Sequence, residues 1–86
     1  MDPIRAVPYQ ALIQVFESDG FRFKRTVGDH LIYSKPGISR PLVIPMYRAV
    51  PVFIIKGLLR TAGMSRERYL VLLAYNPPCG VTISSQ

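Results

Sequence analysis

The residue of this chain best suited to chemistry is its single histidine, which lies beside a tight turn. His30 follows Gly28-Asp29, between two short runs rich in cationic and aromatic side chains. Histidine titrates near neutral pH and can therefore accept or donate a proton. Neighbouring Lys and Arg side chains could stabilise negative charge on a phosphodiester. We therefore take His30 as the candidate for proton transfer, against the alternative that it is a structural residue of the turn.

Other catalytic chemistries have little support in the sequence. The one cysteine, Cys79, cannot form an internal disulfide, and its Pro/Gly-rich surroundings are not those of a cysteine nucleophile. One His and one Cys far apart do not make a zinc site, so we expect no metal and no cofactor. The serines form no nucleophile elbow, and no glycine-rich loop that could bind phosphate is present.

The composition predicts a small basic domain with an anionic partner. The 86 residues include 11 Lys and Arg against 5 Asp and Glu, a net charge of +6. This excess favours a nucleic acid or an acidic protein as partner, the alternative being a basic domain with no such partner. The longest apolar runs fall far short of the ~20 residues of a membrane span, and the first residues do not resemble a signal peptide. We expect a cytoplasmic protein without membrane contact.

The pattern of apolar residues, glycines and prolines predicts an α+β fold. We expect one domain over residues 1–86, with its core at about 8–73 and a tail at 74–86 that is at least partly disordered. The two-residue step Gly28-Asp29 predicts a type II′ hairpin. The expected elements are a helix at 8–19, strands at 21–27, 30–35 and 40–45, a helix from Pro51 to Gly63, and a short helix capped by Ser65. The simplest packing is a three-stranded antiparallel meander with both main helices on one face.

The hairpin register predicts which side chains share a face of the sheet. It pairs Val27 with His30, Arg25 with Ile32, and Phe23 with Ser34. We expect Phe21, Phe23, Val27 and Ile32 under the helices, and Arg22, Lys24, Thr26, Leu31, Tyr33 and Lys35 on the open face. Cations around an aromatic ring are typical of surfaces that hold single-stranded nucleic acid, although a solvated sheet face has a similar composition. This register puts His30 on the helix side, unless the turn extends beyond the helices or a bulge shifts the pairing.

Five short motifs, in order, resemble those of the HicA (YcfA-like) family of small mRNA interferase toxins, over about residues 9–73. They are Asp19-Gly20-Phe21, Lys24–His30, Val43-Ile44-Pro45, Leu58–Gly63 and Ser65–Leu73. Three positions differ from the usual pattern. Asp29 stands where Ser is commoner, Tyr47 stands where many members carry a second His, and Phe53–Lys56 replaces Gly-Thr-Leu-Arg.

The resemblance implies a double-stranded-RNA-binding-like α-β-β-β-α fold with His30 in the place of the family's catalytic histidine. It also implies cleavage of mRNA without a metal and neutralisation by a cognate HicB antitoxin that covers the active site.

Within this frame we expect His30 to act as general acid or base, with charge stabilisation from Lys24, Arg25 and Lys35. Arg22 and Tyr33 would contact RNA, and Asp29 could orient the imidazole or serve only as a turn residue. Two other functions remain open, a non-catalytic RNA-binding module of the same fold (a decayed toxin) and a domain whose basic face binds an acidic protein.

Overall fold

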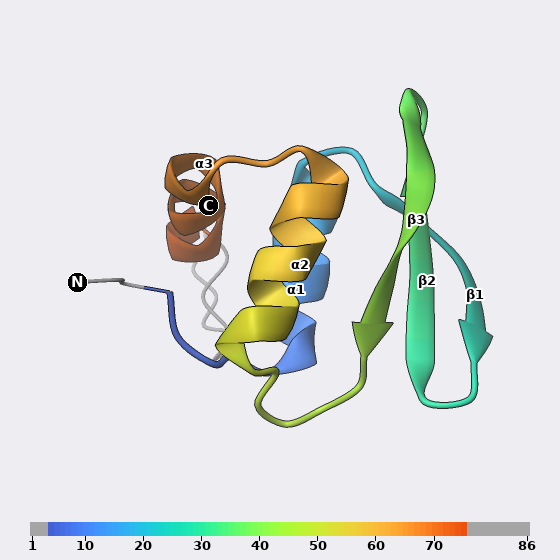
Figure 1. Ribbon diagram of the computed structural model, residues 1–86, viewed down its shortest axis with the longest axis horizontal. Helices are drawn as coiled ribbons and strands as arrows, with labels where there is room; N and C mark the ends of the chain where they lie inside the picture. Colours follow the sequence, from blue (N-terminus) through green and yellow to red (C-terminus); the bar gives the residue numbers. More distant parts are fainter. Residues whose placement is uncertain (1–3, 76–86) are drawn as a thin grey trace, which may run out of the picture.

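A computed structural model describes residues 4–75, which form one helix, three strands and two further helices (Figure 1). The elements are α1 (Tyr9–Ser18), β1 (Arg22–Val27), β2 (His30–Lys35), β3 (Ile38–Pro45), α2 (Val52–Ala62) and α3 (Arg66–Tyr75). This order confirms the predicted α+β fold. The helix α3 includes Ala74 and Tyr75, which the sequence assigned to the tail. The rest of the predicted tail, 76–86, lies outside the described residues, and the extent of the domain over 1–86 stays a prediction.

The helices α1 and α2 lie within one residue of their predicted bounds, and α3 begins directly after its predicted N-cap. The helix α2 ends at Gly63, whose φ of 67° lies in the left-handed region that glycine adopts without strain. The amide of Met64 donates to the carbonyl of Leu59 at 2.9 Å, so the last turn is closed by a Schellman-type bond. Ser65 Oγ accepts a hydrogen bond from the backbone N–H of Arg68 at 3.1 Å, which confirms Ser65 as the N-cap of α3.

The sheet is an antiparallel meander in the order β1-β2-β3, so β3 is an edge strand, a position that tolerates its two prolines. It begins at Ile38, two residues earlier than expected. Gly37 has a φ of 90°, and this conformation lets the chain reverse tightly enough for Ile38 to pair with Lys35. The expected loop over residues 35–39 is therefore a short turn.

All three helices lie on one side of the sheet, with β1 the strand farthest from them (Figure 1). The helix α2 packs on β3, and α1 lies against both β3 and α3. The core forms where these elements meet. Its largest fully buried side chains are Leu12, Val15, Phe16, Phe21, Leu42, Ile44, Val50, Ile55 and Tyr69.

The structure corrects the predicted assignment of the sheet faces. Leu42 and Ile44 of β3 are fully buried beneath the helices, and their pairing partners on β2 are Tyr33 and Leu31. Because side chains alternate along a strand, Tyr33 and Leu31 face the helices while His30 and Ile32 face the other way. The helices cover β3 and β2 rather than β1, so β3 decides which face is inside.

A β-bulge in β1 accounts for the remaining difference between the predicted and the observed faces of the sheet. The register shifts between Phe23 and Arg25, so Phe23 pairs with Tyr33 instead of Ser34, whereas Arg25 and Val27 keep their predicted partners. Phe23 and Val27 therefore lie on opposite faces. Phe23, on the helix side, is 51% exposed because β1 extends beyond the helix layer, and Val27, on the side away from the helices, is 54% exposed. We call the side of the sheet away from the helices the outer face, and define it by Arg22, Arg25, Val27, His30, Ile32 and Val43.

Two buried tyrosines should respond differently to loss of their hydroxyl groups. Tyr33 Oη donates to Glu17 Oε2 at 3.2 Å, whereas buried Tyr69 Oη has no partner among the described residues. We expect Tyr33→Phe to lower the free energy of unfolding by about 1 kcal/mol, and Tyr69→Phe to leave it unchanged or raise it by up to about 1 kcal/mol. Urea unfolding at neutral pH measures both. A larger loss in Tyr69→Phe than in Tyr33→Phe would contradict this description.

The same two side chains give a pH test. Burial, supplemented at Tyr33 by the Glu17 carboxylate, raises the pKa of Tyr33 to about 12, and burial alone raises the pKa of Tyr69 to about 12. Unfolded tyrosine ionises at about 10, so above that pH the unfolded state loses protons that the folded state keeps. The stability that these groups contribute is complete below about pH 10 and is lost as the pH rises toward 12. Each Phe variant should show a shallower alkaline loss than the unsubstituted protein.

Candidate functional site

His30 begins β2 on the outer face of the sheet, at the end of the β1–β2 turn. Its Nδ1 lies 3.0 Å from Oδ1 of Asp29. The side chains are 41% and 72% exposed, so the imidazole is accessible to a large ligand while one of its nitrogens is engaged. The difficulty that the predicted register raised for His30 is removed, because along β2 the side chains that face the helices and those that face away are exchanged relative to the prediction.

The turn that carries His30 is held against the segment between β3 and α2. The N–H of Met46 donates to the carbonyl of Asp29 at 2.9 Å, and His30 pairs with Pro45 across the sheet. Gly28 supports the reversal with a φ of 60°, as the hairpin prediction required. Tyr47, two residues beyond Pro45, is 41% exposed. The backbone of the turn is therefore held by the start of the segment that carries Tyr47.

Arg25 is the cation best placed to act with His30. Val27 pairs with His30, and Arg25 lies two residues further along the same face of β1. Diagonal neighbours in an antiparallel pair have Cα atoms about 7–8 Å apart, within reach of a long side chain. Arg25 is exposed and makes no ion pair with the described residues. Arg22 shares the face farther along β1, and Lys24 is the extra, exposed residue of the bulge.

Lys35 does not belong to this group, contrary to the prediction from the sequence. It lies at the opposite end of β2 from His30, about 16 Å along the strand. Its Nζ is 3.3 Å from Oδ2 of Asp19 and 5.4 Å from the centre of the Phe21 ring. The pattern of cations around the hairpin could not reveal this, because the partner Asp19 belongs to the C-cap of α1. Lys35 is an internal ion-pair partner of the helix layer.

Tyr33 is likewise misplaced by the sequence-based prediction. Only 4% of it is exposed, and its hydroxyl is bonded to Glu17 of α1. Its ring lies edge-on to that of Phe23, with centroids 5.7 Å apart. A ring packed in this way offers no face to an RNA base, so Tyr33 is not placed to make the RNA contact that the sequence predicted.

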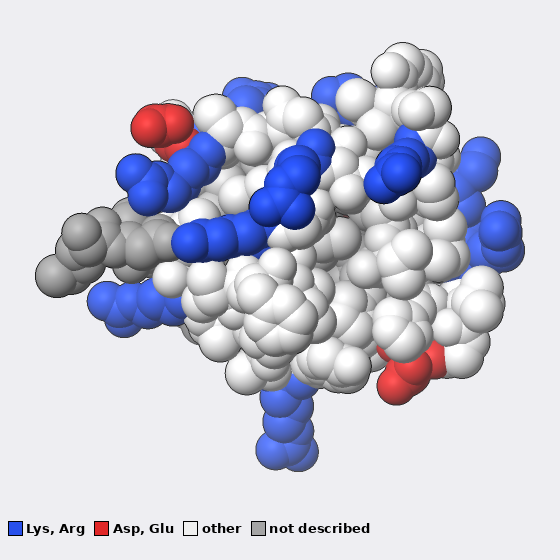
Figure 2. Space-filling view, in the orientation of Figure 1, with Lys and Arg blue, Asp and Glu red and all other residues white. Residues whose placement is uncertain are grey.

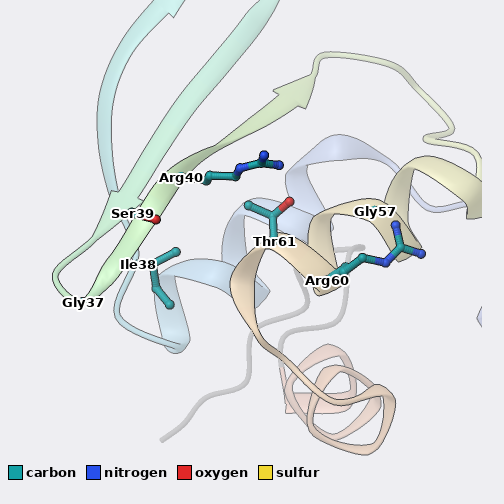
Figure 3. A pocket seen from close by; sticks show the side chains of 7 residues that line it. All are labelled: Gly37, Ile38, Ser39, Arg40, Gly57, Arg60 and Thr61. Carbon is teal, nitrogen blue, oxygen red and sulfur yellow. The ribbon is translucent and has the colours of Figure 1, made fainter.

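The positive charge of the protein is spread over several regions. Figure 2 shows Lys and Arg side chains both over the helices and toward the sheet, with acidic side chains visible in two places. Outside the histidine turn, a cavity of about 420 Å³ lies between the start of β3 and α2, with Arg40 and Arg60 in its lining (Figure 3). The sequence analysis did not single out these two arginines, because they are 20 residues apart and belong to different elements.

The described part of the chain offers few other kinds of site. Within residues 4–75, no group of three or more His, Cys, Asp or Glu side chains is arranged to hold a metal ion. None of the helices described there has both the length and the apolar character to cross a membrane.

The fold and the turn together define a small basic α+β domain with an open sheet face and an exposed histidine. The model of the family described as "HicA toxin of bacterial toxin-antitoxin" matches residues 9–64, which run from the start of α1 to just beyond α2. The chain therefore belongs to the HicA toxin family, and it is the toxin of a toxin–antitoxin system. No curated protein and no solved structure matches the chain.

Substitution of Lys35 and of Arg25 should distinguish a cation that stabilises the fold from one that does not. Lys35→Met removes an ion pair with a carboxylate that is only 11% exposed, together with a cation–π contact, and should lower the free energy of unfolding by about 1 kcal/mol. Arg25→Met should leave it within about 0.5 kcal/mol. Urea unfolding of both variants measures the difference. Equal values would mean that the Asp19 pair contributes nothing.

Proposed function

We propose that this chain is a metal-independent endoribonuclease, an mRNA interferase, in which His30 transfers the proton. The observation that carries the proposal is the position of His30: an exposed imidazole on the outer face, paired with Asp29 and two residues along the sheet from Arg25. Membership of the HicA family supports the same activity.

The Asp29 contact suggests which nitrogen would act on RNA. A carboxylate oxygen 3.0 Å from Nδ1 favours the tautomer in which Nδ1 carries the hydrogen and donates it to Asp29. In neutral imidazole the other nitrogen, Nε2, then holds the free electron pair. Nε2 is the atom that we assign to the substrate, and Asp29 positions the ring.

RNA carries its own nucleophile, so the protein need only move protons and stabilise charge. Nε2 of His30 would take the proton of a 2′-hydroxyl while that oxygen bonds to the adjacent phosphorus. The bond from phosphorus to the 5′-oxygen breaks, and that oxygen takes up a proton from water. Protonated His30 then returns its proton to solvent, and the products carry a 2′,3′-cyclic phosphate and a 5′-hydroxyl. Arg25 would stabilise the extra negative charge of the pentavalent phosphorus in between. Positioned acid–base catalysis by one group contributes roughly 10²–10⁴-fold, which fits a nuclease of modest rate.

The natural inhibitor in this proposal is a HicB-like antitoxin with an acidic surface that covers the outer face. Arg25 is exposed there near the turn, and Lys24 is exposed in the adjacent bulge. Val27 and Val43, which share the outer face, are 54% and 45% exposed. Such a mixed surface suits a protein partner as well as RNA, because burial of the two apolar side chains would add to charge attraction. A partner seated on this face would exclude RNA from His30.

The catalytic role is tested by cleavage of RNA in the presence of a metal chelator. We expect cyclic-phosphate ends from the unsubstituted protein, loss of cleavage in His30→Ala, and a smaller reduction in Asp29→Asn, because the imidazole remains but is less well held. Arg25→Gln should lower kcat more than it raises KM, since its charge matters most in the transition state. Lys35→Gln is the matched control and should cleave normally wherever it is folded.

Full cleavage by folded His30→Ala would overturn the mechanism. If His30→Ala and the unsubstituted protein bind RNA equally but neither cleaves it, the chain is the non-catalytic RNA-binding module instead.

The antitoxin is tested by its rate of association. We expect complex formation to abolish cleavage, and high salt to slow association, because complementary charge mainly accelerates encounter. Arg25→Glu should slow association, whereas Arg5→Glu, in the segment before α1 on the helix side of the molecule (Figure 1), should not. A complex that still cleaves RNA at the free rate would show that the antitoxin does not cover the outer face.

A further inference from the structure

The cavity between β3 and α2 has the character of an anion site. Its lining consists of Gly37, Ile38, Ser39, Arg40, Gly57, Arg60 and Thr61, which include two cations and two hydroxyl groups but no carboxylate. In Figure 3, the Arg40 side chain extends from β3 across the cavity toward α2, which carries Arg60 and Thr61. We propose that this cavity binds a phosphate group.

The charges of the cavity are not compensated by the part of the protein that the structure describes. Arg40 and Arg60 are both exposed, and neither makes an ion pair or side-chain hydrogen bond with residues 4–75. Arginine stays protonated at any physiological pH, so both cations of the lining keep their charge and are available to an anion. A guanidinium presents several N–H donors in one plane, which suits the oxygens of a phosphate.

Gly57 gives a second, independent indication. It lies in the interior of α2, where glycine is less favourable than alanine. A Cβ at this position would meet no atom within 4 Å, so packing does not require a glycine. What the missing side chain provides is open space in the wall of the cavity, next to Arg60 and Thr61. A bound group of the size of a phosphate would use that space.

The cavity is separate from the histidine turn. His30 pairs with Pro45 at the end of β3, whereas the cavity lies beside Ser39 and Arg40 near its start, about 20 Å away along the strand. Arg40 lines the cavity between β3 and α2 and therefore lies on the helix side of the sheet, whereas His30 faces the opposite side. The site is therefore not the scissile position. Its phosphate could belong to a distant part of an RNA backbone or to a free nucleotide.

The first test is a titration of the isotopically labelled full-length protein with inorganic phosphate, followed by NMR at constant ionic strength. We expect saturable shifts of the amide signals of Gly37, Gly57 and Thr61. Arg40→Gln and Arg60→Gln should each weaken binding about tenfold, as the loss of a charge-assisted hydrogen bond would. Gly57→Leu, which fills the open space, should weaken it as well. Arg5→Gln removes the same charge outside the cavity and should have no effect.

The absence of saturable shifts at the cavity, or equal affinity in Arg40→Gln and Arg5→Gln, would overturn the proposal. So would an acidic peptide that saturates the cavity while phosphate does not.

The second test separates the two sources of phosphate and does not depend on cleavage. It compares the His30→Ala protein with the double variant His30→Ala/Arg40→Gln. For each protein, the affinity is measured for an RNA of about ten nucleotides and for adenosine monophosphate. A backbone phosphate as occupant predicts that Arg40→Gln weakens RNA binding about tenfold and that inorganic phosphate competes with the RNA. If the occupant is a free nucleotide, Arg40→Gln should lower the affinity for adenosine monophosphate and leave the affinity for RNA unchanged. If Arg40→Gln changes neither affinity, the cavity is not a phosphate site, whatever His30 does.

Discussion

The burial of Tyr33 against α1 is the constraint on which the functional surface depends. Its ring is almost wholly within the core, and its hydroxyl is hydrogen-bonded to Glu17. Because neighbouring side chains on a strand point to opposite faces, an inward Tyr33 requires Ile32 and His30 to point outward. The orientation of His30 is thus a consequence of how Tyr33 packs, four residues beyond the turn.

A second constraint joins the helix layer to the sheet at the far end of β2. Asp19 forms the C-cap of α1, where a negative charge is unfavourable beside the carbonyl end of the helix. Its two oxygens lie 3.3 Å from Lys35 Nζ and 2.8 Å from Arg68 Nε, so cations from β2 and α3 offset that cost. One carboxylate therefore connects α1, β2 and α3. This contact removes Lys35 from the positive surface and makes it part of the framework.

Three of the arginines without partners among the described residues lie at two places near the ends of β3. Arg25 lies on the outer face near the histidine turn, and Arg40 and Arg60 flank the cavity on the helix side. The protein thus separates cations that hold the fold together from cations that are available to a ligand. A net charge alone cannot make that distinction, because it counts both kinds equally.

Local rules in the sequence were sufficient for the elements, the capping residues Gly63 and Ser65, the hairpin at Gly28, and the resemblance to the HicA family. Each of these rests on neighbours in the chain, such as a glycine that allows a positive φ or a serine three residues before an amide. The sequence also singled out His30, and it left open whether Asp29 orients the imidazole or only forms the turn; the structure places Asp29 Oδ1 3.0 Å from His30 Nδ1. Only the tertiary structure decided which face of the sheet lies inside, because that choice depends on the strands that the helices cover. It likewise decided the positions of Tyr33 and Lys35, whose partners Glu17 and Asp19 belong to α1 and its C-cap, and it placed Arg40 of β3 and Arg60 of α2 in the lining of one cavity.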